Sequence, residues 1–328
     1  MRLLESLKMQ RHKDFEVIIV DGGSSDKTPS LEADFASFFP VKYIRQRQGG
    51  FVAAVNEGMH VCSGEIYLRT DDDVVGSPDW LQAICESFSV SERVRVGGVT
   101  GPVSTPDEGL QNRDLFALQA RFKTSNQLWR LIGWFYYDYL MEKKAFDISR
   151  DVRCGAFTFG ANFPEATKLS GEIEVDHHES CNMAVRIDLL RKVGGFDNTF
   201  IETAEYCDSD VSYKIRKLGY KILFNPKALI YHYPSKQGFF SKRFYSYHRI
   251  ENFIRFYFRH IRPNTLDKLI RFFAYICFLN TYFIYIFFTT GKIAALGSIP
   301  SSLINIPKYA LITLFHKEGK NATHKIQK

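Results

Sequence analysis

The 328-residue chain is longer than one average domain, and its 45% hydrophobic content is enough for a sizeable core. Residues 1–235 carry 28 basic and 33 acidic side chains, whereas residues 236–328 carry 15 and 3, so the formal net charge of +7 comes from the C-terminal part. We therefore expect no nucleic-acid partner. Six cysteines without paired spacing or neighbouring histidines indicate neither a zinc site nor a disulfide framework, and the polar residues 1–13 do not resemble a signal peptide.

The first predicted elements are a helix, a strand and a polar loop. Apolar residues at helical spacing predict a helix over residues 2–10, and the run VIIV predicts a buried strand over residues 17–20. The strand ends at Asp21 and a Gly/Ser loop, after which a helix is expected to start with Ser25 or Asp26 as its cap.

Two further strands enclose a helix of small residues. VKYIRQ predicts the second strand, GGFVAAVNEGMHVC a crossover helix, and EIYLRT a third strand that ends at Asp71, Asp72 and Asp73. Strands that alternate with helices indicate a parallel α/β sheet, in which ligands bind at the carboxyl ends of the strands. Asp21 and the three adjacent aspartates all lie at such ends.

The three adjacent carboxylates repel one another, so crowding them costs free energy unless a cation or a proton donor compensates. One interpretation is a solvated loop whose acids cap the next helix. The other is a site for Mg²⁺ or Mn²⁺, which prefer carboxylate oxygens and commonly share their coordination shell with substrate phosphates. The residues alone leave both interpretations open.

Residues 100–175 are harder to interpret. They include the aromatic run NQLWRLIGWFYYDYL, which fits either a buried helix or a surface that lies against lipid, and we favour the buried helix. A regular pattern returns with a predicted helix over residues 208–218, which stops at Gly219 as a C-cap requires, and with the strand KILF that follows it.

Three polar residues in this last region are ambiguous. Asp208 and Asp210, at the start of the predicted helix, either complement the helix dipole or supply a general base. His232, in the strand-like LIYHYP, is by itself more often a core or edge histidine than a metal ligand.

Five motifs follow one another along the chain: EVIIVDGGSSD, GGFVAAVNEG, GEIYLRTDDDVVGSPDWL, CNMAVRIDLLRKVGGFD and CDSDVSYKIRKLGYKILFNPKALIYH. Their joint pattern, over residues 1 to about 235, resembles the family-two glycosyltransferases of the GT-A fold. The resemblance implies a Rossmann-like α/β fold with a mixed, mainly parallel sheet and flanking helices. It also implies a nucleotide-sugar donor, a glycan or lipid-linked acceptor, and a divalent metal, Mn²⁺ or Mg²⁺.

The resemblance also assigns donor-binding residues. Asp21 would contact the nucleoside base of the donor. Arg47 and Asn56 would lie in the region that approaches the nucleotide, where Arg47 could pair with a phosphate. Asp71 and Asp72 would bind the ribose and diphosphate.

The metal and the catalytic base follow from the same resemblance. Asp71 and Asp73 would hold the metal, and His232, at the end of a later strand, would complete its shell. Asp208 takes the place of the aspartate that deprotonates the acceptor hydroxyl.

Three departures from the family pattern stand out. The usual first strand is missing, because the chain opens at what should be the first helix. The acidic pair that contains the base reads Cys207-Asp208, so its glutamate is replaced while the proposed base remains. The QxxRW signature of processive synthases is absent, which favours the addition of single sugars.

The C-terminal part has a different character. Residues 236–271 hold nine basic and two acidic side chains, which with their aromatics predict an interfacial helix on anionic headgroups. The aromatics include Phe244, Tyr245, Tyr247, Phe256 and Tyr257. Residues 272–290 are uncharged and long enough to span a hydrocarbon core of about 30 Å, although a buried core helix is an alternative. Residues 293–315 are a weaker segment that fits a second span, a re-entrant segment or an interfacial helix.

We therefore expect a catalytic domain over residues 1–235, a basic aromatic segment over residues 236–271, and membrane segments with a basic tail over residues 272–328. Basic residues before the span place the catalytic domain on the cytoplasmic side. The expected protein is a membrane-anchored, metal-dependent, inverting glycosyltransferase that binds membrane lipids. Two alternatives stay open: a catalytically impaired GT-A-like binding or assembly protein, and a metal-dependent nucleotidyltransferase.

Overall fold

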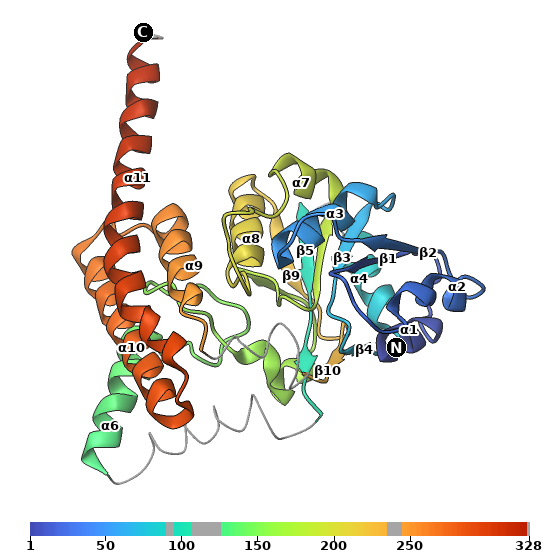
Figure 1. Cartoon of the computed structure of the whole chain (residues 1–328), viewed down its shortest axis with the longest axis horizontal. Helices are drawn as coiled ribbons and strands as arrows, with labels where there is room; N and C mark the ends of the chain where they lie inside the picture. The colour runs from blue at the N-terminus through green and yellow to red at the C-terminus, as the bar shows by residue number, and fades with distance from the viewer. Residues whose placement is uncertain (90–94, 107–125, 235–244, 327–328) are drawn as a thin grey trace. The chain divides into compact units, whose positions relative to one another are not determined.

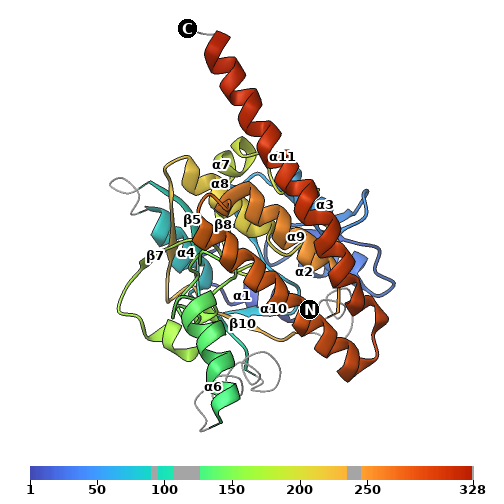
Figure 2. The same cartoon turned by 90° about the vertical axis from the view of Figure 1, so that its left-hand side faces the viewer.

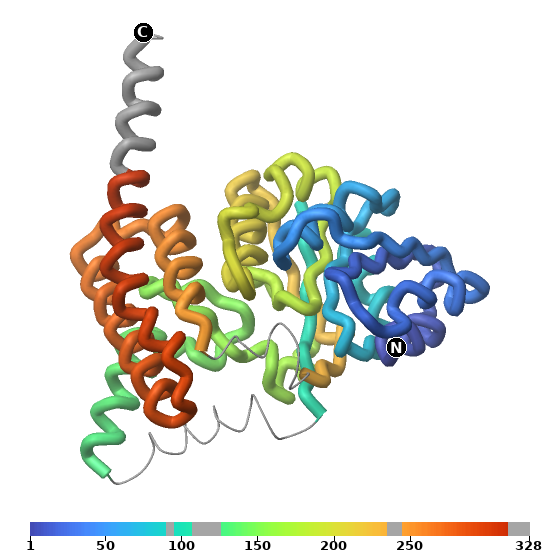
Figure 3. The backbone as a smooth tube through the Cα atoms, in the orientation of Figure 1, coloured from blue at the N-terminus to red at the C-terminus, as the bar shows by residue number. Residues whose placement is uncertain are grey.

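A computed structural model describes residues 1–89, 95–106, 126–234 and 245–326, with side chains in the last helix up to residue 313 (Figures 1 and 3). The chain forms two compact units. The sheet unit comprises Met1–Val152, Phe157–Thr199 and Cys207–Ser235, and the helical unit comprises Arg153–Ala156, Phe200–Tyr206 and Lys236–Lys328. Two short segments from the first 235 residues therefore group with the C-terminal helices. The three predicted domain ranges stay a prediction.

The described strands of the sheet unit form three sheets. β1 (Val17–Asp21) and β2 (Val41–Arg45) pair with each other. The largest sheet has the order β3-β8-β5-β9-β7, formed by Ile66–Arg69, Met183–Arg186, Val96–Thr100, Lys221–Phe224 and Ile173–Val175. The third has the order β4-β10-β6, formed by Val74–Gly76, Ile230–His232 and Val103–Ser104.

The predicted α/β fold with a mixed sheet and flanking helices is confirmed. Among the described strands, β1 with β2, β5 with β9 and β6 with β10 pair in parallel. The pairs β3–β8, β5–β8, β7–β9 and β4–β10 are antiparallel. The share of parallel pairs is thus smaller than in the expected mainly parallel sheet. The reason is that β8 pairs antiparallel with β3 and β5, and β4 pairs antiparallel with β10.

The unit has seven described α-helices. They are α1 (Arg2–Lys8), α2 (Leu31–Phe35), α3 (Phe51–Val61), α4 (Trp80–Ser89), α6 (Gln127–Gly133), α7 (Ile187–Lys192) and α8 (Cys207–Lys217), with 3₁₀ turns at Thr28–Ser30, Gly160–Asn162 and Pro164–Lys168. Helix α6 contacts mainly the segment that follows it in the chain, and most other helices of this unit pack on its strands. Apolar residues of α1 and α4 pack against β4, β5 and β10. Trp80 is fully buried there and donates its indole N–H to Asn182 Oδ1 at 2.9 Å. On β5, Gly97 admits α8 closely, since a Cβ atom would lie 2.7 Å from Ile215 Cγ2.

Local sequence signals predicted several elements well. β1 and β9 occupy the predicted runs VIIV and KILF, and α8 starts one residue before the predicted helix. Gly219 ends that helix with a φ of 85°, and its N–H donates to the carbonyl of Arg216 at 2.9 Å. The cap expected at Ser25 or Asp26 was wrong, since the 3₁₀ turn after β1 has Lys27 as its N-cap, although Asp26 accepts from the backbone N–H of Thr28 at 2.9 Å.

The aromatic run of residues 126–140 forms α6 and a π-helical segment, Trp134–Leu140 (η3). Its buried side chains are Tyr136 and Leu140, whereas Leu128, Leu131 and Trp134 are exposed. The favoured buried-helix interpretation therefore holds for one side of this segment only.

The helical unit consists of α9 (His248–Phe256), a π-helical segment (Tyr257–Ile261, η7), α10 (Leu266–Thr290), a 3₁₀ turn (Ile293–Gly297) and α11 (Ser298–Ile326). Helices α10 and α11 lie side by side with α9 packed against them (Figures 1 and 2). Thr265 caps α10 by accepting from Lys268 N–H at 3.3 Å, and Gly291 ends it with a φ of 68°. Asn280 Nδ2, inside α10, donates to Ser302 Oγ of α11 at 3.0 Å.

Among the described residues, α10 is the one helix long and apolar enough to cross a membrane. Several of its large apolar side chains are exposed, namely Leu266, Ile270, Phe273, Tyr285 and Phe288. Such exposure is unusual for the core helix of a soluble protein, although one helix of this kind is weak evidence for a span. The segment after it forms the 3₁₀ turn and α11, which has Pro307 inside it.

The predicted interfacial helix needs correction. Residues 236–244, including Phe244, lie outside the described residues, and Tyr245 and Tyr247 are half-buried. Phe256 and Tyr257 are buried, and the ring of Tyr257 stacks on Phe272 of α10 at 4.5 Å. These two aromatics pack inside the helical unit and are therefore unable to face lipid.

Candidate functional site

The acidic loop after β3 meets a histidine because of strand pairing. Asp71, Asp72 and Asp73 lie between β3 and β4, and β4 pairs antiparallel with β10 so that Val74 opposes His232. The backbone N–H of Tyr233 donates to the carbonyl of Asp73 at 2.9 Å, and His232 Nε2 lies 3.1 Å from Asp73 Oδ1. Asp73 and His232, 159 positions apart in the chain, thus meet where β4 begins and β10 ends.

Asp71, Asp73 and His232 offer ligand atoms that all lie within 4.8 Å of one another. All three side chains are half-buried, whereas Asp72 is exposed. Burial raises the pKa of Asp71, and Asp72 and Asp73 add to this while Arg69 and His232 oppose it. Two carboxylates and an imidazole at this spacing fit a divalent cation such as Mn²⁺ or Mg²⁺. The structure therefore brings the predicted metal ligands together.

Arg69, the last residue of β3, is a member of this cluster that sequence reasoning missed. Its side chain is 6% exposed, its Nη2 lies 3.6 Å from Asp71 Oδ1, and its guanidinium carbon lies 4.5 Å from the centre of the Phe51 ring. Its Nη1 is buried without a hydrogen-bond partner among the described residues. Burial lowers the pKa of Arg69, but the carboxylates of Asp71 and Asp208 outweigh this and raise it. Arg69 is therefore a buried cation held by acidic neighbours.

Asp208 lies in the first turn of α8, where the helix dipole favours a negative charge. Its side chain is buried, and Cys207 Sγ donates to its Oδ1 at 3.6 Å. Its backbone carbonyl accepts from Ser212 Oγ at 2.8 Å, which fixes the first turn. The charge of Asp208 contributes to the raised pKa of Arg69, whose Nη2 lies 3.6 Å from Asp71 Oδ1, so the predicted base and the acidic loop interact with the same guanidinium.

Glu179 adds another carboxylate that the sequence did not single out. Ser149 Oγ donates to Glu179 Oε1 at 2.8 Å. Burial raises the pKa of Glu179, and the charge of Asp208 adds to this while His177 opposes it. Cys181 is buried between these groups, and burial together with Asp71 and Glu179 raises its pKa. A signal was available in the motif HHESCN, where an acid and two histidines stand directly before a buried strand.

Asp21, at the carboxyl end of β1, is nearly fully buried and well supplied with hydrogen bonds. Its Oδ1 accepts from Ser24 Oγ at 2.6 Å and from Ser24 N–H at 2.8 Å, and its Oδ2 accepts from the Tyr43 hydroxyl at 2.7 Å. Burial raises the pKa of Asp21, but these hydrogen bonds outweigh burial and lower the pKa to about 2. Asp21 is therefore an ionised, fixed acceptor.

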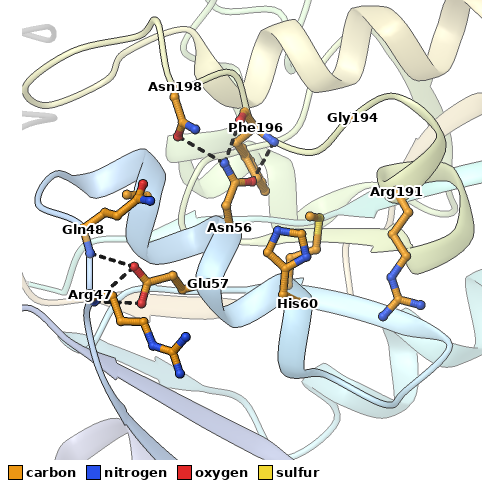
Figure 4. A pocket seen from close by; sticks show the side chains of 11 residues that line it. Arg47, Gln48, Asn56, Glu57, His60, Arg191, Gly194, Phe196 and Asn198 are labelled. Atoms are coloured by element: carbon orange, nitrogen blue, oxygen red, sulfur yellow. Dashed lines mark hydrogen bonds between the residues drawn. The ribbon is translucent and has the colours of Figure 1, made fainter.

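Arg47 and Asn56 line a separate hollow of about 700 Å³ between α3 and the loop after α7 (Figure 4). Asn56 Nδ2 donates to the carbonyl of Phe196 at 2.7 Å, and Asn56 Oδ1 accepts from the Phe196 N–H at 3.0 Å. Glu57 accepts from the backbone N–H of Arg47 at 2.9 Å. Among the described residues that line this hollow, none belongs to the acidic cluster of Asp71, Asp73 and Asp208. The donor-binding roles of Arg47 and Asn56 stay a prediction.

Comparison with known proteins agrees with this arrangement. Residues 1–154 match Glycosyl transferase family 2. The chain is 21% identical over 236 residues to the glucosyl-dolichyl phosphate glucuronosyltransferase of Haloferax volcanii, covering 70% of this chain and 62% of that protein. It spans less than two thirds of the length of the curated relatives that it matches.

Two solved glycosyltransferase structures have a similar fold. One is the mannosyltransferase PcManGT from Pyrobaculum calidifontis in complex with GDP-Man and Mn²⁺, with a TM-score of 0.50 and 18% identity over 95% of this chain and 78% of that one. The other is residues 1–349 of TarS from S. aureus in complex with UDP-GlcNAc, with a TM-score of 0.53 and 16% identity over 94% and 75% of the two chains. At these identities the likeness shows the GT-A fold alone.

Proposed function

We propose, from the premise that residues 1–154 form a Glycosyl transferase family 2 domain, that this protein transfers a sugar from a nucleotide diphosphate sugar to a glycan or lipid-linked acceptor. One observation carries the proposal. Asp71, Asp73 and His232 offer ligand atoms within 4.8 Å of one another, and Arg69, 3.6 Å from Asp71, also interacts electrostatically with the buried Asp208. A cation site beside a fixed carboxylate suits a reaction with an anionic leaving group and a hydroxyl nucleophile.

In the proposed reaction, Asp208 removes the proton of the acceptor hydroxyl while that oxygen attacks the anomeric carbon. The bond to the nucleoside diphosphate breaks in the same step, so the configuration is inverted and no covalent enzyme intermediate forms. A bound Mn²⁺ or Mg²⁺, held by Asp71, Asp73 and His232, would neutralise the charge of the departing diphosphate. We infer single additions because the processive signature is absent from the sequence.

Donor recognition is assigned to the end of β1 and to the loops beside it. Asp21 is held as an ionised acceptor by Ser24 and Tyr43, which suits contact with N–H groups of a nucleoside base. We propose that Asp72 joins Asp71 in contacting the ribose and diphosphate, and that Arg47 pairs with a phosphate. Asn56 would then support the donor region by fixing the loop at Phe196.

A membrane-bound acceptor is supported by α10 and by one relative. The Haloferax volcanii relative is named for an acceptor linked to dolichyl phosphate. We propose that α10 anchors the protein in the membrane and that the basic residues before it keep the sheet unit on the cytoplasmic side. Alkaline carbonate tests the anchor: the full-length protein should stay in the membrane pellet and require detergent for release. A wash with about 1 M salt screens the attraction between surface charges. Release of the protein by such a wash without detergent would contradict the membrane anchor.

The transferase activity is tested with full-length protein in detergent and lipid, supplied with Mn²⁺ and a panel of UDP- and GDP-sugars. Release of UDP or GDP should depend on one donor and on an added membrane-lipid or glycan extract, and a labelled product should appear. Asp208→Asn should lose this activity. Asp188→Asn is the matched control, because Asp188 lies on α7 with an exposed side chain paired to Arg186. Donor binding without any turnover would instead support the impaired binding protein.

A further inference from the structure

The segment Phe200–Tyr206, which runs directly into Cys207 and Asp208, has an unusual backbone. Glu202, Ala204 and Tyr206 have φ angles of 54°, 51° and 73°. None of these three is glycine, asparagine or aspartate, the residues that tolerate a left-handed conformation, so each costs free energy. Such a conformation persists only where surrounding contacts hold it.

One face of α9 supplies these contacts. The face consists of Arg249, Asn252, Phe253 and Phe256, which are spaced i, i+3, i+4 and i+7 along the helix. Asn252 is fully buried, and its amide forms two hydrogen bonds with the backbone of Ile201. Asn252 Oδ1 accepts from Ile201 N–H at 3.1 Å, and Asn252 Nδ2 donates to the Ile201 carbonyl at 2.9 Å.

The other end of the segment is held by an ion pair and by aromatic contacts. Arg249 Nε lies 3.2 Å from Glu205 Oε1, and Thr203 Oγ1 donates to Glu205 Oε2 at 2.7 Å. The ring of Tyr206 packs against Phe256 at 5.1 Å and against Phe253 at 5.7 Å. Glu202 and Ala204 thus lie between fixed points at residues 201 and 205–206, and Tyr206 is itself one of these fixed points.

A buried asparagine and a half-buried ion pair often serve packing alone. Here, however, they hold a strained segment that ends one residue before Cys207 and two before Asp208. A change in one of the three φ angles would redirect the chain where it enters α8. Misplacement of a catalytic group by about 1 Å can cost on the order of 10²-fold in rate.

We propose that Asn252 and Arg249 are positioning residues for Asp208, acting through the chain itself by holding the left-handed segment that leads into α8. The inference rests on the proposed function, since it takes Asp208 as the base. It adds that the contacts of α9 with Phe200–Tyr206 act on Asp208 only through the covalent chain that follows Tyr206. The effect should appear with a soluble acceptor as much as with a lipid-linked one.

The test uses the full-length protein with variants Asn252→Ala and Arg249→Gln. We expect kcat to fall roughly tenfold or more, while the KM for the donor and the affinity for UDP or GDP with Mn²⁺ stay within about twofold. Arg249→Lys, which keeps the ion pair with Glu205, should recover most of the activity. Arg249→Gln and Glu205→Gln should be non-additive, because both remove the same pair. Hydrogen exchange at the Ile201 amide should accelerate in Asn252→Ala.

Two control variants remove similar groups elsewhere in the helical unit. Asn305→Ala deletes a buried asparagine that donates to the Ser301 carbonyl at 2.9 Å, and Arg153→Gln deletes an arginine 2.7 Å from Asp267. Both should keep wild-type kcat. The inference is overturned if Asn252→Ala keeps full kcat, if the controls lose as much, or if donor affinity falls in step with kcat. Absence of turnover in the wild type would instead refute the proposed function, so the two failures are distinguishable.

Discussion

The acidic cluster of the sheet unit and the ion pairs of the helical unit balance their charges differently. In the sheet unit, Asp71, Asp73 and Asp208 interact with one guanidinium, Arg69, and one imidazole, His232, although other carboxylates of this unit, such as Asp151 and Asp176, are paired with Arg216. In the helical unit, three described carboxylates are paired with arginines: Glu205 with Arg249, Glu251 with Arg255, and Asp267 with Arg153 and Arg271.

This difference distinguishes charged groups that suit ligand binding from charged groups that hold segments of the chain in place. A charge that is removed from water needs compensation, and a matched pair provides it inside the protein. A cluster with excess negative charge is compensated only when a cation or a proton arrives. The sheet unit therefore keeps a costly arrangement that suits ligand binding, whereas the helical unit uses its pairs to hold segments in place. The predictions below test this distinction.

Removal of the cation should have the largest effect. With chelator present, transfer should fall to background, because the charge of the departing diphosphate would be left without compensation. Asp73→Asn should have the same effect without unfolding the protein. Both are measured as release of nucleoside diphosphate, with re-addition of Mn²⁺ as the control for the chelator. Full turnover in chelator would remove the metal assignment.

Loss of the base should come next. Asp208→Asn should lower kcat by about 10²-fold or more, while donor binding is retained, because the amide is unable to accept the acceptor proton. Its free energy of unfolding should stay within about 1 kcal/mol of wild type, since the variant removes an excess carboxylate rather than one half of a matched pair. Near-normal kcat with weakened donor binding would move Asp208 to a binding role.

The candidate site could be predicted from the sequence only where motif and strand end coincide. Asp21, Asp71 and Asp73 follow apolar strand runs, so their place at the sheet edge is a local consequence of the chain. Arg69 was not predicted because its alternation within EIYLRT gives no sign that it is buried beside two carboxylates. Its burial depends on Phe51 and Asp208, which come from distant parts of the chain.

The same limit applies to the fold. Strands such as β9 and helices such as α8 have local periodicity and a glycine stop, and both were predicted within a residue or so. The contacts of α9 with Phe200–Tyr206 were not predicted. Residues 249–256 were interpreted as part of an interfacial segment because of their basic and aromatic composition. An amphipathic helix looks alike whether its apolar face packs on lipid or on another segment of the chain, and only tertiary contacts distinguish the two.

Replacement of Arg69 should destabilise the sheet unit in a way that a cation can offset. Arg69→Met should lower the free energy of unfolding by roughly 2–4 kcal/mol, because Asp71 and Asp208 lose their buried counter-charge. Added Mn²⁺ should stabilise this variant more than it stabilises wild type. The comparison is Arg255→Met in the helical unit, which breaks the pair with Glu251 at 3.1 Å and should gain no extra stability from Mn²⁺. Equal Mn²⁺ effects in both variants, measured by denaturant unfolding, would argue against an excess of negative charge in the sheet unit.

The smallest expected effect is a gain of stability. Burial raises the pKa of Glu179 above its usual value of 4.5, so the folded protein holds this proton more tightly than the unfolded chain does. The ionised carboxylate therefore costs stability at neutral pH, and Glu179→Gln should stabilise the protein by up to about 1 kcal/mol at pH 7. The gain should vanish as the pH falls below 4.5, where Glu179 is protonated in both states.

The matched variant in the helical unit should change stability in the opposite direction. Glu205→Gln removes the partner of Arg249, 3.2 Å away, and should destabilise the protein at pH 7 by about 1–3 kcal/mol in full-length protein unfolded by denaturant. The two glutamates differ in their neighbours rather than in their chemistry, since burial and the charge of Asp208 raise the pKa of Glu179 against the opposing charge of His177, whereas Glu205 pairs with an arginine. If both substitutions destabilised to the same extent, the carboxylates of the sheet unit would be compensated like those of the helical unit, and their excess would no longer indicate a site for a cation.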